Sequence, residues 1–124
     1  MNTENLVKRE EMSEIGRAYY KASRIARNLT ETFQAQIAGL KRDLAYMVER
    51  VEMPLNRETA TLFPVDAATE AVGQVTSYVS GMNLNYFMKS ASDLAQAQAQ
   101  VSVLTPLVDA TEKARIDELL AFYA

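Results

Sequence analysis

Residues 12–51 read MSEIGRAYYKASRIARNLTETFQAQIAGLKRDLAYMVERV, and this stretch decides the fold. Apolar side chains recur in it every three or four residues, which is the period of a helix that packs lengthwise on other helices. The recurring positions are Met12, Ile15, Tyr19, Ala22, Ala26, Leu29, Phe33, Ile37, Leu40, Leu44, Met47 and Val51. The pattern predicts a long helix with a coiled-coil-like apolar seam. The seam residues expected to hold an assembly together are Tyr19, Leu29, Phe33, Ile37, Leu40 and Leu44.

The long helix is expected over residues 1–53, with Thr3 as its N-cap and Pro54 as its stop. Asn28 and Gly39 are weak points, so the sequence leaves open whether the helix is continuous or folds back as a hairpin. Forty helical residues span about 60 Å, whereas a partner helix of 20 residues covers about 30 Å. This mismatch predicts a homo-oligomer or a complex with a larger protein.

The remainder of the chain predicts shorter helices. A proline-bounded connector is expected over 54–66, with Asp66 capping the next helix, and a helical hairpin plus a C-terminal helix over 67–124. A break is expected at Gly81–Asn85, and a capping box at Asp109-x-x-Glu112. Val72–Val79 also fits a strand, but the 3.6-residue period extends beyond a normal strand length. The predicted fold is all-α: a single domain in which the long N-terminal helix packs antiparallel on two or three shorter helices.

The sequence contains no cysteine and no histidine. Disulfides, thiolate or imidazole metal sites, cysteine nucleophiles and Ser-His-Asp triads are therefore excluded. We expect no catalytic residue, no cofactor and no metal site. The charged first residues do not resemble a signal peptide, and no apolar run is long enough to span a membrane. The expected location is the cytoplasm, or a virion in an infected host cell.

A basic stripe on the long helix is the sharpest local feature. It consists of Arg17, Lys21, Arg24 and Arg27, and residues 16–30 contain no acidic residue. Residues 54–124 carry four basic against eight acidic residues. The stripe is either a binding surface for an anionic partner or a solvated face balanced by the chain's own acids, and we favour the second interpretation. A pI near 5.0 and the lack of a nucleic-acid-binding motif argue against sequence-specific recognition of nucleic acid.

Tyr86, Phe87 and Met88 predict a second apolar surface. Three consecutive large apolar residues cannot all face one core, because neighbouring helical residues point about 100° apart. At least one of the three is expected to face a partner helix or a second subunit.

The pair Arg57-Glu58 follows a proline and a long helix that carries basic residues. In this it resembles the all-helical chorismate mutases. The resemblance implies a small enzyme that holds a dianion with Arg and Lys and catalyses by electrostatics. When Glu58 is set on the acidic residue of that family, Arg17 matches a basic position. Gln34, Ala45 and Leu94, however, stand where the family has an Arg, a Lys and a Gln.

These observations favour a non-catalytic helical interaction or assembly protein. A small acidic chain without cysteine or catalytic motifs is similar to many phage-encoded proteins, such as virion accessory components and inhibitors of host defence. The alternative is an amphipathic coat protein on lipid or storage granules, similar to the phasin-like proteins.

Overall fold

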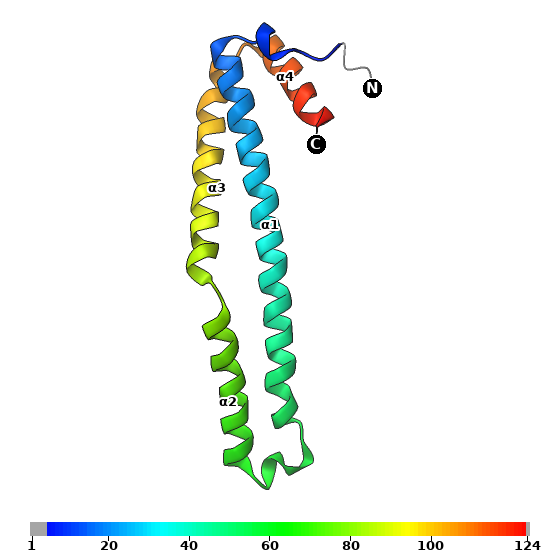
Figure 1. Ribbon diagram of the computed structural model, residues 1–124, viewed down its shortest axis with the longest axis vertical. Coiled ribbons are helices and arrows are strands. Elements are labelled where there is room, and N and C mark those ends of the chain that lie inside the picture. Colours follow the sequence, from blue (N-terminus) through cyan, green and yellow to red (C-terminus); the bar gives the residue numbers. More distant parts are fainter. Residues whose placement is uncertain (1–4, 124) are drawn as a thin grey trace. The chain divides into compact units, whose positions relative to one another are not determined.

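The computed structural model describes residues 5–123, in which every regular element is helical. The elements are η2 (Arg9–Glu11), α1 (Glu14–Leu55), η3 (Glu58–Thr61), α2 (Pro64–Gly81), α3 (Leu84–Leu104), η4 (Thr105–Leu107) and α4 (Ala110–Phe122). The all-α prediction is confirmed, and the long helix α1 contacts both α2 and α3. Figure 1 shows α2 and α3 running antiparallel to the stretch of α1 beside each of them.

Contacts divide the described residues into two compact units. The core unit contains residues 5–33 and 88–123, and the hairpin unit contains Gln34–Phe87. α1 packs on α3 in the core unit and on α2 in the hairpin unit. The two shorter helices thus share a seam that neither is long enough to cover alone. The length of α1 by itself no longer requires an oligomer, and oligomerisation stays a prediction.

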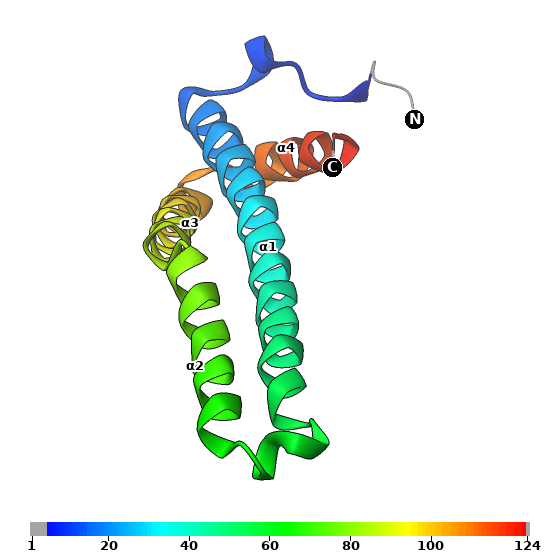
Figure 2. The same ribbon diagram turned by 60° about the horizontal axis from the view of Figure 1, so that its bottom comes forward.

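The core unit is organised around Ile116 of α4, which is completely buried. The other buried members of this apolar cluster are Leu6, Val7, Met12, Tyr19, Val108, Leu119 and Leu120. They come from the N-terminal segment, the first turns of α1, the α3–α4 connection and α4. In Figures 1 and 2 the N-terminal segment runs beside α4, so both ends of the sequence contribute to one core.

The start of α1 differs from the prediction. Thr3 lies outside the described residues, and residues 5–13 form a non-α segment that buries Leu6 and Val7. α1 begins at Glu14, where the Ser13 side chain acts as the cap: its Oγ accepts a hydrogen bond from the Gly16 N–H at 2.9 Å. The sequence pattern favours a helix that begins before Ser13. It does not form, because the N-terminal segment is buried in the core and Ser13 caps α1.

α1 is continuous through both of its predicted weak points and ends at Leu55. A Cβ at Gly39 would meet nothing closer than Arg42, at 3.7 Å, so no turn or close helix crossing requires glycine there. The hairpin alternative for residues 1–53 is therefore wrong. Pro54 lies fully buried in the last turn of α1, and the helix stops one residue after it.

In the hairpin unit, the second half of α1 and α2 lie side by side, joined through η3 (Figure 1). Arg57 and Glu70 close the connection with two hydrogen bonds, of 2.7 and 3.0 Å. Asp66 is not the cap of α2, because Pro64 takes the first helical position and Phe63 precedes it without a side-chain cap. Asp66 lies instead in the first turn, where its charge favours the helix dipole.

The predicted break after Gly81 is confirmed. α2 ends at Gly81, and Asn83 Oδ1 accepts a hydrogen bond from the Tyr86 N–H at 3.0 Å at the start of α3. Val72–Val79 is helical throughout, so the strand alternative is wrong. The second half of α1, α2 and the first turn of α3 thus form a helical hairpin. This hairpin has two faces, one on each side of the plane that contains the axes of α1 and α2.

Candidate interaction surfaces

An extended apolar surface lies on one side of the hairpin unit, and we call it the hairpin face. Its α2 members are Val72, Val75 and Val79, with exposed fractions of 63%, 38% and 49%. Its α1 members are Leu44, Val48 and Leu55, with exposed fractions of 40%, 49% and 49%. Apolar side chains exposed to this degree along two adjacent helices are typical of a surface that another protein covers.

Helix geometry places both sets of residues on the same side. Each residue advances about 100° around the helix axis. Viewed along the α1 axis, the α1 members are therefore rotated by about 40–80° from Leu40, which is half-buried. The α2 members lie about 80–140° past Ala67, a buried residue, in the same sense of rotation. Because the two helices are antiparallel, equal senses of rotation bring both sets to one side. The opposite side carries polar residues such as Asp43, Glu70 and Ser77.

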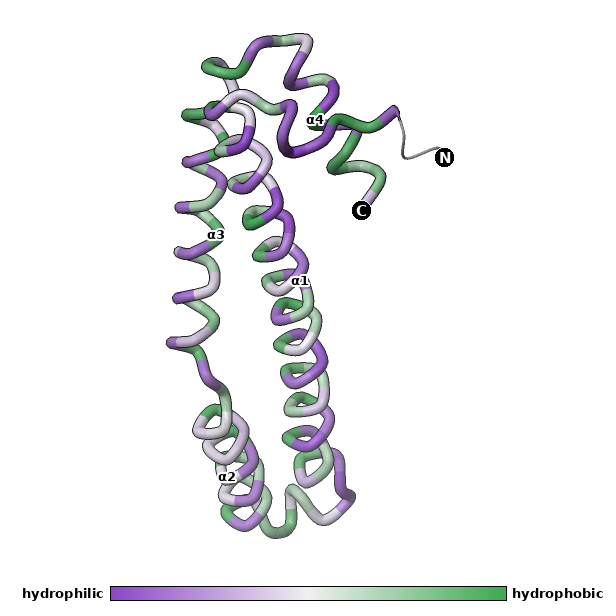
Figure 3. The backbone as a smooth tube through the Cα atoms, turned by 45° about the horizontal axis from the view of Figure 1, so that its top comes forward, coloured by the Kyte–Doolittle hydropathy of each residue, from purple (hydrophilic) through white to green (hydrophobic). Residues whose placement is uncertain are grey.

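The hairpin unit buries little of its own apolar surface. Its only buried residues in the described structure are Pro54, Ala67 and Ala71, two of which are alanines. In addition, residues 71–88 include no charged side chain, although most of them are exposed. Figure 3 shows that the hydrophobic residues of α1 gather along the edge toward its neighbouring helices. Two helices with so small a core are marginal in water unless a further surface packs on them.

The basic stripe borders a groove in the core unit. Arg17, Lys21 and Arg24 line a hollow of about 460 Å³, together with Arg9, Ala18, Tyr20, Ile25 and Asn28. Arg27 lies with Arg24 in an adjacent hollow that reaches Leu120 and Tyr123 of the C-terminal region. The Arg24 guanidinium is 5.7 Å from the centroid of the Tyr20 ring. The groove therefore combines cationic groups with apolar and aromatic surface.

None of the four stripe residues forms an ion pair with any residue in the range 5–123. The ion pairs of this range join Arg57 to Glu70, Lys89 to Asp93, Lys113 to Asp117 and Arg115 to Glu11. Among residues 5–123, the stripe's one side-chain hydrogen bond runs from Arg17 Nε to the Arg9 carbonyl, at 3.1 Å. Within residues 5–123, the acidic residues of the C-terminal half thus form no ion pair with the stripe, and the choice between the two interpretations stays a prediction.

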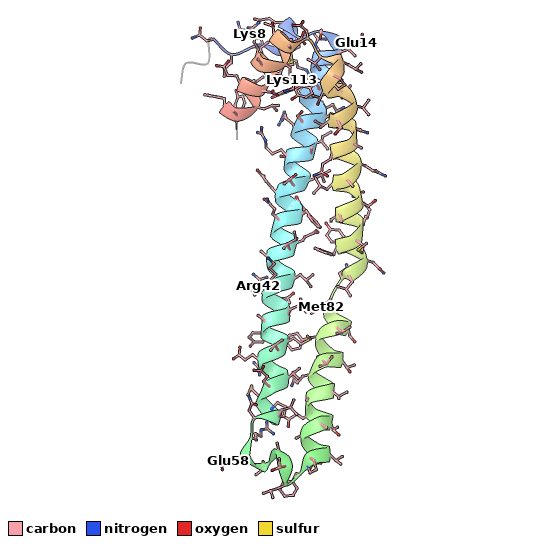
Figure 4. The ribbon with its side chains drawn as sticks, turned by 180° about the vertical axis from the view of Figure 1, so that it is seen from behind. Lys8, Glu14, Arg42, Glu58, Met82 and Lys113 are labelled. Carbon is pink, nitrogen blue, oxygen red and sulfur yellow. The ribbon has the colours of Figure 1, made fainter. Side chains whose placement is uncertain are left out.

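A polar network joins α4 to the first turns of α1. The Tyr19 hydroxyl donates to Asp117 Oδ1 at 2.6 Å, and Lys113 Nζ donates to Asp117 Oδ2 at 2.7 Å. Figure 4 places Lys113 where α4 meets α1. Burial raises the pKa of Tyr19, and the neighbouring Asp117 raises it further. Burial alone would raise the pKa of Asp117, but hydrogen bonds from Lys113 and Tyr19 outweigh burial, and the pKa is lowered.

These shifts have opposite consequences for stability. The stabilisation from Asp117 is present above the ordinary pKa of an aspartate and is lost as the pH falls to the lowered value. The stabilisation from Tyr19 is present below the ordinary pKa of a tyrosine and is lost as the pH rises through the raised value. At neutral pH both contributions are present, and the network joins α4 to α1 within the core unit.

Glu112 joins the same two helices by a different contact. Its Oε1 accepts hydrogen bonds from the Ser13 N–H at 3.0 Å and from the Ser13 hydroxyl at 2.7 Å. Asp109 does cap α4, accepting from the N–H groups of Thr111 and Glu112. The carboxylate of Glu112 completes the cap of α1 instead of reaching back to its own helix. A Cβ at Gly16 would overlap the Glu112 carboxylate, so this contact requires the absence of a side chain at Gly16.

The other predicted site residues fall in different environments. Along the predicted seam, Tyr19 is buried, Leu29, Phe33, Ile37 and Leu40 are half-buried, and Leu44 is exposed. Of the predicted second apolar surface, Tyr86 and Met88 are 55% and 66% exposed, whereas Phe87 is half-buried. Tyr86 and Phe87 border a small hollow between α1 and the start of α3, of about 210 Å³.

The residues behind the chorismate mutase resemblance do not gather into a cationic pocket in the hairpin unit. Arg57 pairs with Glu70, and Glu58 lies exposed in η3. Figure 4 shows Glu58 at the tip of the hairpin and Arg42 on the side of α1 away from α2. Among residues 5–123 no cluster of three or more acidic side chains is arranged to hold a metal ion. None of the helices in the described chain has the length and apolar character of a bilayer-spanning segment.

No protein-family model matches this sequence, and no curated protein and no solved structure is significantly similar to it. The functional argument therefore starts from the surfaces alone. Sequence reasoning identified the basic stripe but missed the hairpin face as a unit. Its signal was present in the uncharged run 71–88 and in the periodic valines of α2, but the packing of α1 on α2 was needed to decide which side remains open.

Proposed function

We propose that this chain is a non-catalytic helical interaction protein that works by burying its hairpin face against another helical surface. The observation that carries the proposal is the exposure of valines and leucines along both helices of a unit whose own core is three small residues. Apolar burial contributes about 25 cal/mol per Å² of surface removed from water, so covering this face would stabilise the hairpin and the complex together.

Hydrogen exchange measured by mass spectrometry tests the proposal. In the variant Val72→Lys with Val79→Lys, we expect faster exchange over residues 34–87 and unchanged exchange over residues 88–123. Both valines are at least 49% exposed, so lysine disturbs a covering partner and not the chain's own core. Protection of backbone amides from exchange measures how well a segment is covered, so the exchange of the hairpin itself shows whether its face is covered.

The control variant is Ser77→Lys with Ser80→Lys, which adds the same charge to exposed positions on the side of α2 turned away from the valines. It should leave the exchange of the hairpin as in the wild type. If the hairpin is strongly protected in the wild type and equally so in the valine variant, the hairpin needs no cover and the proposal is wrong. A coat function on lipid would appear as protection that arises only when vesicles are added.

The basic stripe supports a second candidate function, binding of an acidic segment of a protein partner. Its four cations make no ion pair within the described chain, and the groove beside them includes Tyr20 and Ile25. Cationic and apolar groups side by side suit a peptide that carries both acidic and apolar residues. Phage-type roles, such as a virion accessory component or an inhibitor of a host system, are compatible with either surface.

Charge reversal tests this second function. In the variant Arg17→Glu with Arg24→Glu we expect binding of a fluorescent Glu-rich peptide to be lost, while helicity and the melting temperature stay close to those of the wild type. Arg42→Glu with Arg50→Glu is the control, because it reverses two exposed charges of α1 outside the groove. A stable wild-type protein that does not bind the peptide even at low salt would argue against the groove. A fall in melting temperature without a change in binding would support the solvated-face interpretation.

A further inference from the structure

We propose that the surface that covers the hairpin face is the hairpin face of a second copy of this chain. The two hairpins would pack face to face as a four-helix bundle, with each helix antiparallel to its own copy. This inference rests on the proposed function and names the partner. It follows from symmetry in the positions of apolar and charged residues within the hairpin unit.

The apolar line on α1 reads the same in both directions. Ile37, Leu44, Val48 and Leu55 are separated by seven, four and seven residues, so the line is centred on Tyr46. In an antiparallel pair centred there, Leu44 of one copy lies opposite Val48 of the other, and Ile37 opposite Leu55. A twofold axis requires this property, because both copies contribute the same surface.

The charged residues beside this line are complementary under the same operation. Lys41 and Glu52 are exposed, flank the apolar line and form no ion pair with a residue of the described chain. Antiparallel pairing about residues 46–47 sets Lys41 of each copy against Glu52 of the other. Parallel pairing in register would set each of these charges against its own kind. The charges therefore favour the antiparallel arrangement of two copies.

α2 carries an apolar line that is symmetric to within one residue about the same level of the hairpin. Its line consists of Ala68, Val72, Val75, Val79 and Met82; Ala68 and Met82 each lie seven residues from Val75, and Val72 and Val79 lie three and four residues from it. Pro54 and Ala67 line one hollow between the helices, and Asp43 and Tyr78 line another. From Pro54 back to Tyr46 and from Ala67 forward to Val75 are both eight residues, so Tyr46 of α1 lies level with Val75 of α2 along the hairpin. One twofold axis thus serves both helices, and α2 has no charge near it to oppose contact with its copy.

A single cysteine at the axis tests the arrangement, because the natural chain has none. We expect Val75→Cys to form a disulfide-linked dimer on mild oxidation, since residue 75 of each copy would lie opposite the other. Val65→Cys is the control: it is 75% exposed but lies ten residues from the axis, too far from its copy in an antiparallel pair. Cross-linking of both variants to the same extent would indicate parallel pairing and overturn the proposal.

Charge exchange tests the identity of the partner in solution. We expect Lys41→Glu and Glu52→Lys each to weaken self-association about tenfold in sedimentation equilibrium, because two surface pairs change from attractive to repulsive. A mixture of the two variants should associate as tightly as the wild type, since each supplies the charge the other needs. The double variant, Lys41→Glu with Glu52→Lys in one chain, should also recover. These residues are exposed, and circular dichroism checks that the helices are retained.

The failures of the two proposals are distinguishable. A wild-type protein that sediments as a monomer at all concentrations, with rapid exchange over residues 34–87, overturns the second copy as occupant and leaves a different covering partner. A monomer with a well-protected hairpin overturns the interaction function as well. If the charge variants at positions 41 and 52 self-associate as strongly as the wild type, the proposed antiparallel register is wrong.

Discussion

Ile116→Ala should destabilise the core unit by about 2–5 kcal/mol, the usual range for removing most of a fully buried aliphatic side chain. Ile116 is 0% exposed and lies at the centre of the cluster that joins α4, the start of α1 and the N-terminal segment. Small domains are stable by only about 5–15 kcal/mol in total, so this single change removes a large share. Urea unfolding followed by circular dichroism measures the loss.

Ile25→Ala is the matched comparison, because it makes the same chemical change at a residue that is 43% exposed in the basic groove. It should cost much less than the change at Ile116. Similar losses for the two variants would mean that α4 does not dock on the core as described. Ile116→Ala should also destabilise the core unit without directly altering the hairpin face, because Ile116 does not belong to the hairpin unit.

The periodic pattern of the sequence was sufficient to predict the helical class and the apolar seam of α1, but it left open whether the helix is continuous. The seam residues from Leu29 to Leu40 are half-buried on successive turns, as a 3.6-residue period requires. The break after Gly81 was also predictable, because glycine and two asparagines interrupt the pattern within five residues. These features are local, so the chain's own sequence over a few turns contains the information.

The N-terminal segment was not predictable in the same way. Leu6 and Val7 are followed by charged residues with good helix propensity, and nothing local indicates that they are buried. Their burial depends on Ile116 and its neighbours in α4, more than 100 residues later in the sequence. A favourable long-range contact of this kind outweighs intrinsic helix propensities, which differ by less than about 1 kcal/mol for ordinary residues.

The hairpin face shows a related limit. The valines of α2 were identified as a helical apolar line, but a line alone does not reveal whether a neighbouring helix covers it. In the structure the buried residues of α2 are Ala67 and Ala71, and the valines lie between about one ninth and two fifths of a turn around the helix from them. The smaller side chains therefore pack on α1, and the larger ones remain exposed. That choice is set by the angle at which α1 approaches, which the sequence pattern does not specify.

The capping contact between α4 and α1 leads to a prediction in which one substitution has opposite effects in two backgrounds. Gly16 stands at the third position of α1 after its cap Ser13, where a capping box normally has a glutamate. Here Glu112 supplies that carboxylate from α4 and occupies the space of a side chain at Gly16. Gly16→Glu should destabilise the wild-type protein, because two carboxylates and a new Cβ would compete for one position.

In the Glu112→Ala background the same change should stabilise. Glu112→Ala alone removes the acceptor for the Ser13 N–H and should cost about 0.5–2 kcal/mol, as the loss of a helix cap does. Gly16→Glu would then restore an acceptor within α1 and also remove the helix penalty of glycine, which is about 1 kcal/mol. Thermal unfolding of the four proteins gives the coupling energy, for which residues in direct contact typically show about 0.5–3 kcal/mol. The same sign of effect for Gly16→Glu in both backgrounds would show that Glu112 does not complete the cap of α1.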